Sequence, residues 1–314
     1  MSRLTARPAR VFFAALFLAL AMALPAAADF TFAVCADPRP GDFTKPDGTG
    51  WDSALRVIKQ WQRRPPANFQ APAFLVIVGD YDPAAATRRR VREVLGPKAV
   101  WYPVVGNHDL SPEDLAVVRN LIFPIPALPG IVNSGPVGSE GLMYSFDHDD
   151  AHFIVVNEYY DGQKPTGSSG DITEATLAWL KADLERNRKR PIFVFGHEPA
   201  FPEYRHVGDS LDQFPAHRDA FWDLLVERGV SAFFVGHTHY YSRTSRRGVW
   251  QIDAGQIRGV FAREQNDRRN TIVLVRVGEA GVRYAVMQSG GERPFEFKPA
   301  VEWSDLRRHA ARQP

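Results

Sequence analysis

The sequence predicts an α/β fold whose chemistry lies at the carboxyl ends of its strands. Short apolar runs typical of buried strands alternate with segments whose apolar residues recur at helical spacing. Several of these runs stop abruptly on polar side chains, and open α/β sheets place their ligands at such strand ends. The residues that follow these runs are Asp37, Gly79-Asp80, Gly106-Asn107-His108-Asp109, Gly196-His197 and Gly236-His237-Thr238-His239.

The first 28 residues have the pattern of a secretory signal peptide. Arg3, Arg7 and Arg10 precede an apolar run from Val11 to Leu24, and an Ala-x-Ala site follows at residues 26–28. The apolar run is shorter than the roughly 20 residues that a spanning helix needs, so we expect no stable membrane anchor. Cleavage after Ala28 predicts a periplasmic or secreted protein.

Composition predicts one large domain and gives no reason to expect a nucleic-acid partner. Removing residues 1–28 takes three arginines from a formal net charge of +2, which leaves −1. We expect the domain to span residues 29–300 and to be followed by a polar tail at 301–314. The single cysteine, Cys35, cannot form an internal disulfide and is interpreted as a small core residue.

The first half of the chain predicts three strands that alternate with helices. Proline is rare in central strands, so Pro103 argues against a central place for the third strand. Ser111 followed by Pro112 is a typical helix start. The expected elements are strands at Thr31–Ala36, Phe74–Val78 and Val100–Val105, and helices from Asp52, over Ala84–Leu95 and after Ser111.

The second half predicts a long loop at 124–140, a hairpin, two further strand–helix units and a β-rich end. The hairpin turn at 147–150 is rich in Asp and His, but strand-like residues flank it, so we interpret it as a turn rather than a metal site. Asp171 with Glu174 has the spacing of a capping box. The expected strands are Met143–Phe146, His152–Asn157, Ile192–Phe195, Phe233–Val235, Gly248–Asp253, Thr271–Val277 and Val282–Gln288.

The polar strand ends offer nitrogen and oxygen ligands for metal ions. Iron, zinc and manganese suit such donors, and the lack of cysteine ligands argues against a structural zinc site. A pair of ions can activate water and stabilise both oxygens of a phosphoryl transfer. Capping of a helix or turn is an alternative interpretation of Asp80 or Asn107 alone, but it does not explain two histidines separated by one residue. The candidate ligands are Asp37, Asp80, Asn107, His197, His237 and His239.

In this order, the motif blocks resemble those of the calcineurin-like metallophosphoesterase superfamily. The resemblance implies a two-sheet α/β/β/α sandwich with two metal ions at the strand ends, Asp80 bridging them. It implies that Asn107, His197 and His237 complete one shell, and that Asp37 and His239 hold the other ion. His108 would assist the leaving group, with Asp109 orienting it.

The chain departs from the family pattern at Arg39, where a metal-binding histidine is common. A guanidinium stays protonated and cannot ligate a metal, so one of the two sites is one ligand short. Either water fills the gap or that ion binds weakly. A further hypothesis is that Arg39 contacts substrate phosphate as a bidentate fork. His206, next to Tyr204 and Arg205 in the loop after residue 197, is a second candidate for substrate contact.

These observations predict an exported metal-dependent hydrolase of small phosphate mono- or diesters, in which metal-activated water attacks phosphorus. The alternative is a metal- and phosphate-binding protein that Arg39 has weakened as a catalyst and that acts in binding or sensing. A structural or adhesion module is a third reading. His148, His152, His217 and His309 are interpreted as ordinary structural histidines. Loops at 40–50, 124–140, 158–171 and 200–214 are expected to form the pocket rim.

Overall fold

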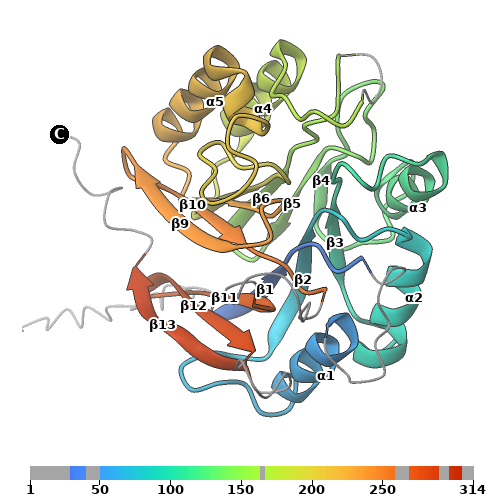
Figure 1. The fold of residues 1–314 in the computed structure, drawn as a ribbon, viewed down its shortest axis with the longest axis vertical. Helices are drawn as coiled ribbons and strands as arrows, with labels where there is room; N and C mark the ends of the chain where they lie inside the picture. Colours follow the sequence, from blue (N-terminus) through green and yellow to red (C-terminus); the bar gives the residue numbers. More distant parts are fainter. Residues whose placement is uncertain (1–28, 40–49, 163–166, 259–268, 290–296, 306–314) are drawn as a thin grey trace, which may run out of the picture.

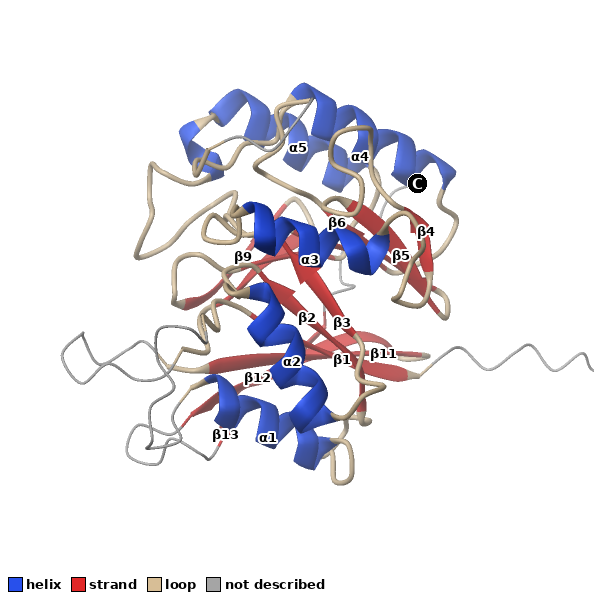
Figure 2. Ribbon diagram, turned by 90° about the vertical axis from the view of Figure 1, so that its right-hand side faces the viewer, coloured by secondary structure: helices blue, strands red, loops and turns tan. Residues whose placement is uncertain are grey.

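Two β-sheets stack face to face, with helices on both outer faces (Figure 1, Figure 2). The computed structural model describes residues 29–39, 50–162, 167–258 and 269–289, and the backbone of 297–305. The expected α/β/β/α sandwich is confirmed. The expected signal peptide lies outside the described residues. Within the described ranges, no helix combines the length and apolarity needed to cross a bilayer.

The first sheet contains the strands that deliver Asp37, Asp80 and Asn107. Its order is β13-β12-β11-β1-β2-β3, and β1 pairs in parallel with β2, as β2 does with β3. Pro103 lies in β3, which is the edge strand, where a missing N–H disrupts no ladder. The strands are β1 (Phe30–Cys35), β2 (Pro72–Val78), β3 (Trp101–Val104), β11 (Thr271–Gly278), β12 (Gly281–Ser289) and β13 (Phe297–Asp305). Helices α1 (Trp51–Trp61), α2 (Ala84–Leu95) and α3 (Pro112–Ile122) lie on this side of the molecule (Figure 2).

The second sheet delivers the three histidines from β7 and β8. Its order is β4-β5-β6-β7-β8-β10-β9, with β6, β7, β8 and β10 mutually parallel. The strands are β4 (Ile131–Asn133), β5 (Tyr144–His148), β6 (Ala151–Val155), β7 (Ile192–Phe195), β8 (Ala232–Val235), β9 (Tyr241–Arg246) and β10 (Val249–Ala254). Helices α4 (Glu174–Arg186) and α5 (Pro215–Glu227) cover its outer face, and a 3₁₀ turn, η1 (Leu211–Gln213), precedes α5.

Side-chain alternation along the strands builds the core in layers. In β1, Phe32 and Val34 point between the sheets, whereas Ala33 and Cys35 point toward the helices. The layer between the sheets is rich in phenylalanine from both sides. Cys35 is fully buried, as expected, and burial raises the pKa of its thiol. This packing fixes the strand ends, and with them the site.

Four local expectations differ from the structure. Strand β13 runs to Asp305, so residues 301–305 of the expected tail belong to the first sheet. Strand β4 lies inside the expected loop at 124–140, and β9 was not predicted because its polar sequence has no apolar alternation. Thr173, not Asp171, caps α4 by accepting from the amide of Thr176. Asp171 instead contacts His217.

Candidate metal centre

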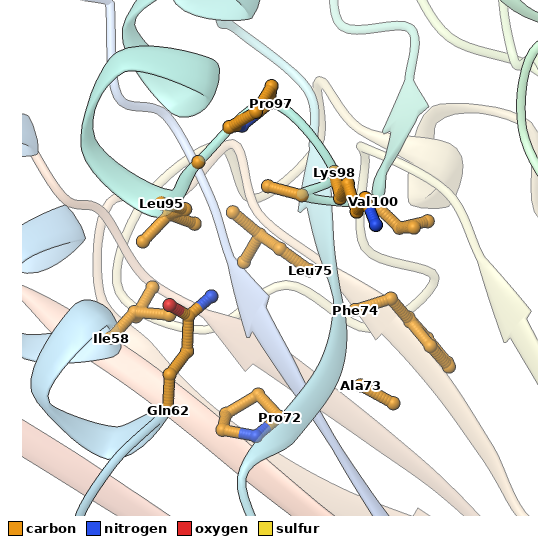
Figure 3. Close-up of a pocket in the computed structure, with 12 residues that line it drawn as sticks. Ile58, Gln62, Pro72, Ala73, Phe74, Leu75, Leu95, Pro97, Lys98 and Val100 are labelled. Atoms are coloured by element: carbon orange, nitrogen blue, oxygen red, sulfur yellow. The ribbon is translucent and has the colours of Figure 1, made fainter.

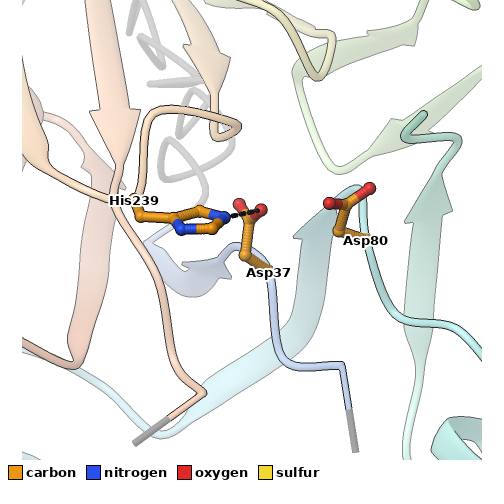
Figure 4. Close-up of side chains that lie close together, drawn as sticks. All are labelled: Asp37, Asp80 and His239. Atoms are coloured by element: carbon orange, nitrogen blue, oxygen red, sulfur yellow. Dashed lines mark ion pairs between the residues drawn. The ribbon is translucent and has the colours of Figure 1, made fainter. Parts of the chain in front are cut away.

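Three of the expected ligands meet where the two sheets come together. Asp37, Asp80 and His239 each place one ligand atom within 4.8 Å of the others, and all three residues are buried (Figure 4). His239 Nε2 lies 3.1 Å from Asp37 Oδ1. Asp37 follows β1, Asp80 follows β2 and His239 follows β8, so the parallel strand ends do place these side chains together.

The remaining expected ligands lie next to this group. His197 Nε2 is 3.4 Å from Asp80 Oδ1 and 3.2 Å from Asn107 Oδ1. The ring of His237 lies 5.0 Å from that of His197. All six expected ligands therefore gather in one region, and Asp80 contacts both subsets.

The donor set fits metal cations. Asp37 is fully buried, and apart from its ion pair with His239 its Oδ1 accepts no hydrogen bond from any described residue. Burial raises the pKa of Asp80. Burial also acts to raise the pKa of Asp37, but His239, His197 and His237 together outweigh it and lower that pKa. Burial alone would lower the pKa of His197, but Asp80 and Asp37 outweigh it and raise it to about 10. Buried carboxylates with unsatisfied oxygens beside imidazole nitrogens are what an N/O metal site requires.

The backbone at the site is held in a sparsely populated conformation. Asp37, Asp80, His237 and His239 have φ values of 52°, 55°, 69° and 63°, in the left-handed region that L-residues rarely adopt. Such strain persists only where the surrounding structure enforces it, and it clusters at functional sites. It turns each ligand inward immediately after its strand.

The glycines that precede the ligands allow neighbouring strand ends to approach each other closely. Most of them are not needed for a sharp backbone turn. Only Gly79 among the four expected glycines has a positive φ, at 88°, and an added Cβ there would lie 2.0 Å from His197 Nδ1. A Cβ at Gly106 would lie 2.5 Å from the Asp80 amide nitrogen. Neighbouring strand ends are therefore too close for any side chain at these positions.

The Asp109 carboxylate binds backbone amides in place of the His108 ring that it was expected to orient. Its carboxylate accepts hydrogen bonds from the amides of Asp80, Tyr81 and Gly106, at 2.8–2.9 Å. Asp109 is fully buried, and among the described residues its carboxylate bonds to backbone amides and not to the His108 ring. It ties the end of β2 to the end of β3, so it orients Asp80 rather than His108.

His108 and Arg39 lie together at the mouth of the site. The His108 side chain is 44% exposed, and its Nε2 is 3.9 Å from Asp80 Oδ2 and 3.2 Å from Arg39 Nη1. Asp82, which sequence reasoning missed, holds the guanidinium from the other side, with Arg39 Nε 3.0 Å from its Oδ1. Arg39 therefore takes a fixed position beside His108.

The loop that follows β7 returns His206 to the site. The His206 ring lies 4.0 Å from that of His237, and its Nδ1 is 3.2 Å from the Asp209 carboxylate. Its neighbour Arg205 places Nη1 2.6 Å from His239 Nδ1. The structure thus brings His206 to the ligands, together with an arginine to which the sequence assigned no separate role.

A buried pair of glutamates supports the end of β7, and sequence reasoning missed both. Glu158 Oε2 accepts from the amides of His197 and Glu198, and Glu198 Oε1 accepts from Tyr159 Oη and the Gly170 amide. Burial and mutual repulsion raise the pKa of Glu158 to about 8. Glu158 follows an apolar run, as the ligands do. This position in the sequence could have marked it as a residue of the site.

An apolar pocket of about 320 Å³ lies away from the ligands (Figure 3). Its lining includes Ile58 of α1 and Gln62 just after that helix, Pro72 at the start of β2, and Leu95 at the end of α2. These positions lie at the amino-terminal end of β2, opposite the edge that holds Asp80. The pocket is therefore separate from the candidate centre.

Comparisons with known proteins agree with this geometry. The model of the calcineurin-like phosphoesterase family matches residues 30–241. Glycerophosphodiester phosphodiesterase GpdQ of Enterobacter lignolyticus (strain SCF1) is 30% identical over 161 residues, covering 50% of this chain and 51% of that protein. Purple acid phosphatase 18 of Arabidopsis thaliana is 28% identical over 154 residues, covering 46% of this chain and 31% of the relative. The matches thus span about half or less of these relatives.

Solved structures share the fold. Purple acid phosphatase PPD1 from yellow lupin (Lupinus luteus) superposes with a TM-score of 0.57 at 12% identity, covering 87% of this chain and 53% of that one. GAP50, the anchor in the inner membrane complex of Plasmodium, superposes with a TM-score of 0.54 at 14% identity. The superposition covers 86% of this chain and 88% of that one. The family model covers every strand-end motif from Asp37 to His239, so the chain belongs to the calcineurin-like phosphoesterase family.

Proposed function

We propose that this chain is an exported, metal-dependent hydrolase of small phosphate mono- or diesters. The single observation that carries the proposal is the convergence of Asp37, Asp80, Asn107 and three histidines from five strand ends. The named activities of the relatives, phosphatase and phosphodiesterase, support a phosphate ester as substrate. Export rests on the signal-peptide pattern of residues 1–28.

The ligand set divides into two groups that share Asp80. Asn107, His197 and His237 would hold one ion, and Asp37 and His239 the other. Iron, manganese or zinc would suit these donors. When bound, such ions supply charge neutralisation and a water of lowered pKa.

The chain's own residues complete the chemistry. His108 lies at the mouth, where its exposed ring can give a proton to the departing alkoxide. Arg39, fixed by Asp82, can donate to phosphate oxygens beside His108. His206 borders the same region through its contact with His237.

One observation favours a second candidate, a metal- and phosphate-binding protein with little turnover. Arg39 stands where the resemblance places a metal-binding histidine, and its guanidinium is directed to Asp82 and His108. Such a protein would bind metal and phosphate but hydrolyse no ester across a broad panel.

The test is hydrolysis of 4-nitrophenyl phosphate by the metal-loaded protein and by N107A and H237A. We expect metal-dependent turnover in the wild type and its loss in both variants, with an unchanged circular dichroism spectrum. Undiminished activity in both variants would overturn the assignment.

A further inference from the structure

Three consecutive residues of the loop after β7 contact the last motif or the residue that follows it. The Tyr204 ring lies 5.8 Å from Tyr240, Arg205 Nη1 is 2.6 Å from His239 Nδ1, and the His206 ring lies 4.0 Å from His237. Tyr204 and His206 have φ values of 69° and 57°, so the backbone on both sides of Arg205 is held in the left-handed region. Tyr204 and His206 therefore hold Arg205 next to the ligand group.

Two guanidinium groups border the ligand group. Arg39 contacts His108, which lies beside Asp80, and Arg205 contacts His239, which lies beside Asp37. The Arg39 side chain is 16% exposed, and Arg205 is half-buried. In such partly dehydrated positions, attraction to an anion is less screened than at the open surface.

The chemistry of the two ester classes differs at this point. A phosphate monoester carries two negative charges near neutral pH and three non-bridging oxygens. A diester carries one charge and two such oxygens. If two non-bridging oxygens face the metal-ligand group, only the monoester has a third to offer an arginine.

We propose that Arg205 is a specificity-determining residue that selects dianionic phosphate monoesters over diesters. This inference rests on the proposed hydrolase function and narrows its substrate class. Arg205 would donate to the oxygen that a diester lacks, so its loss penalises the monoester selectively.

The experiment compares kcat/KM for 4-nitrophenyl phosphate and bis(4-nitrophenyl) phosphate in the wild type, R205Q, R205K and R63Q. We expect R205Q to lose about 10- to 100-fold on the monoester and at most about 3-fold on the diester, because a hydrogen bond to a charged group is lost. The kcat/KM of R205K on the monoester should lie between those of the wild type and R205Q. Lysine keeps the positive charge but cannot form the two parallel hydrogen bonds of a guanidinium. Arg63 is an exposed arginine beyond α1, so R63Q is the charge-matched control. We expect its kcat/KM on both substrates to equal that of the wild type. Equal losses on both substrates would overturn the inference and leave the proposed function standing.

Equilibrium binding separates the inference from the proposed function. Inorganic phosphate should bind the metal-loaded wild type about 10-fold or more tightly than R205Q by titration calorimetry, with equal melting temperatures. If phosphate binding falls in R205Q while no ester is hydrolysed, the function fails and the dianion site stands. Equal phosphate affinity in wild type and R205Q overturns the inference.

Discussion

Glu158 Oε2 accepts a hydrogen bond of 2.8 Å from the backbone amide of His197. The same oxygen accepts from the Glu198 amide at 2.7 Å, so one carboxyl group joins the end of β6 to the end of β7. The ligand His197 is thus held through its backbone, and its ring is held by a bond between Nδ1 and the Val78 carbonyl.

Replacing Glu158 should weaken metal binding. We expect E158A to lower metal affinity about 10- to 100-fold, the effect typical of residues that support a ligand, because two buried amides lose their acceptor. E158Q keeps a carbonyl acceptor and should retain most of the affinity, since the raised pKa of Glu158 makes its neutral form abundant near neutral pH. Metal titration calorimetry is the measurement, and equal affinities in all three proteins would contradict it.

Gly79 should tolerate no side chain. G79A introduces both a left-handed alanine and a Cβ 2.0 Å from the His197 ring. G208A is the matched control, because Gly208 has a φ of 91° and open space around its Cβ position. We expect G208A to cost about 1–2 kcal/mol of unfolding free energy and G79A distinctly more. Similar melting temperatures for the two variants would show that the close approach does not matter.

His152 should make stability depend on pH. Burial alone would lower its pKa, but Asp183 and Asp147, at 2.9 and 2.7 Å, outweigh it and raise that pKa. Protonated His152 can donate to both carboxylates, whereas the neutral ring can donate to only one. Its stabilisation is therefore fully present below the unfolded pKa of about 6.5 and is lost as pH rises through the raised folded value.

The measurement is the melting temperature of wild type and H152Q between pH 5 and pH 9. We expect the wild type to be more stable by about 2–3 kcal/mol near pH 5, the value of hydrogen bonds to charged groups, and the difference to shrink toward pH 9. The lowered pKa of Asp183 adds a loss of stability only at more acidic pH. A difference that is constant across the range would contradict this assignment.

Arg39 should control metal stoichiometry. R39H supplies an imidazole two residues after Asp37, and R39Q removes the cation without supplying a ligand. After dialysis, we expect elemental analysis to find fewer than two tightly bound ions in the wild type and R39Q, and two in R39H. A wild type that already retains two ions would show that neither position is weak.

The sequence predicted the residues that lie at strand ends. It did not predict the side-chain contacts between residues far apart in the chain. The apolar runs predicted most of the strands and the convergence of the polar residues at their ends, and the family resemblance predicted the two sheets. It could not predict that Asp109 turns to the amides of β2, or that Asp82 holds Arg39. A buried carboxylate finds its partners through tertiary packing, and residues such as Glu158 and His197, 39 positions apart, leave no local pattern.

The account depends on the convergence of these side chains on metal ions. Crystals grown with Mn²⁺ and measured at its absorption edge test it directly. The account predicts anomalous density beside Asp80, within bonding distance of His197 and His237, with a weaker second peak near Asp37 and His239. Crystals soaked in millimolar Mn²⁺ that show no anomalous density at Asp80 would contradict it.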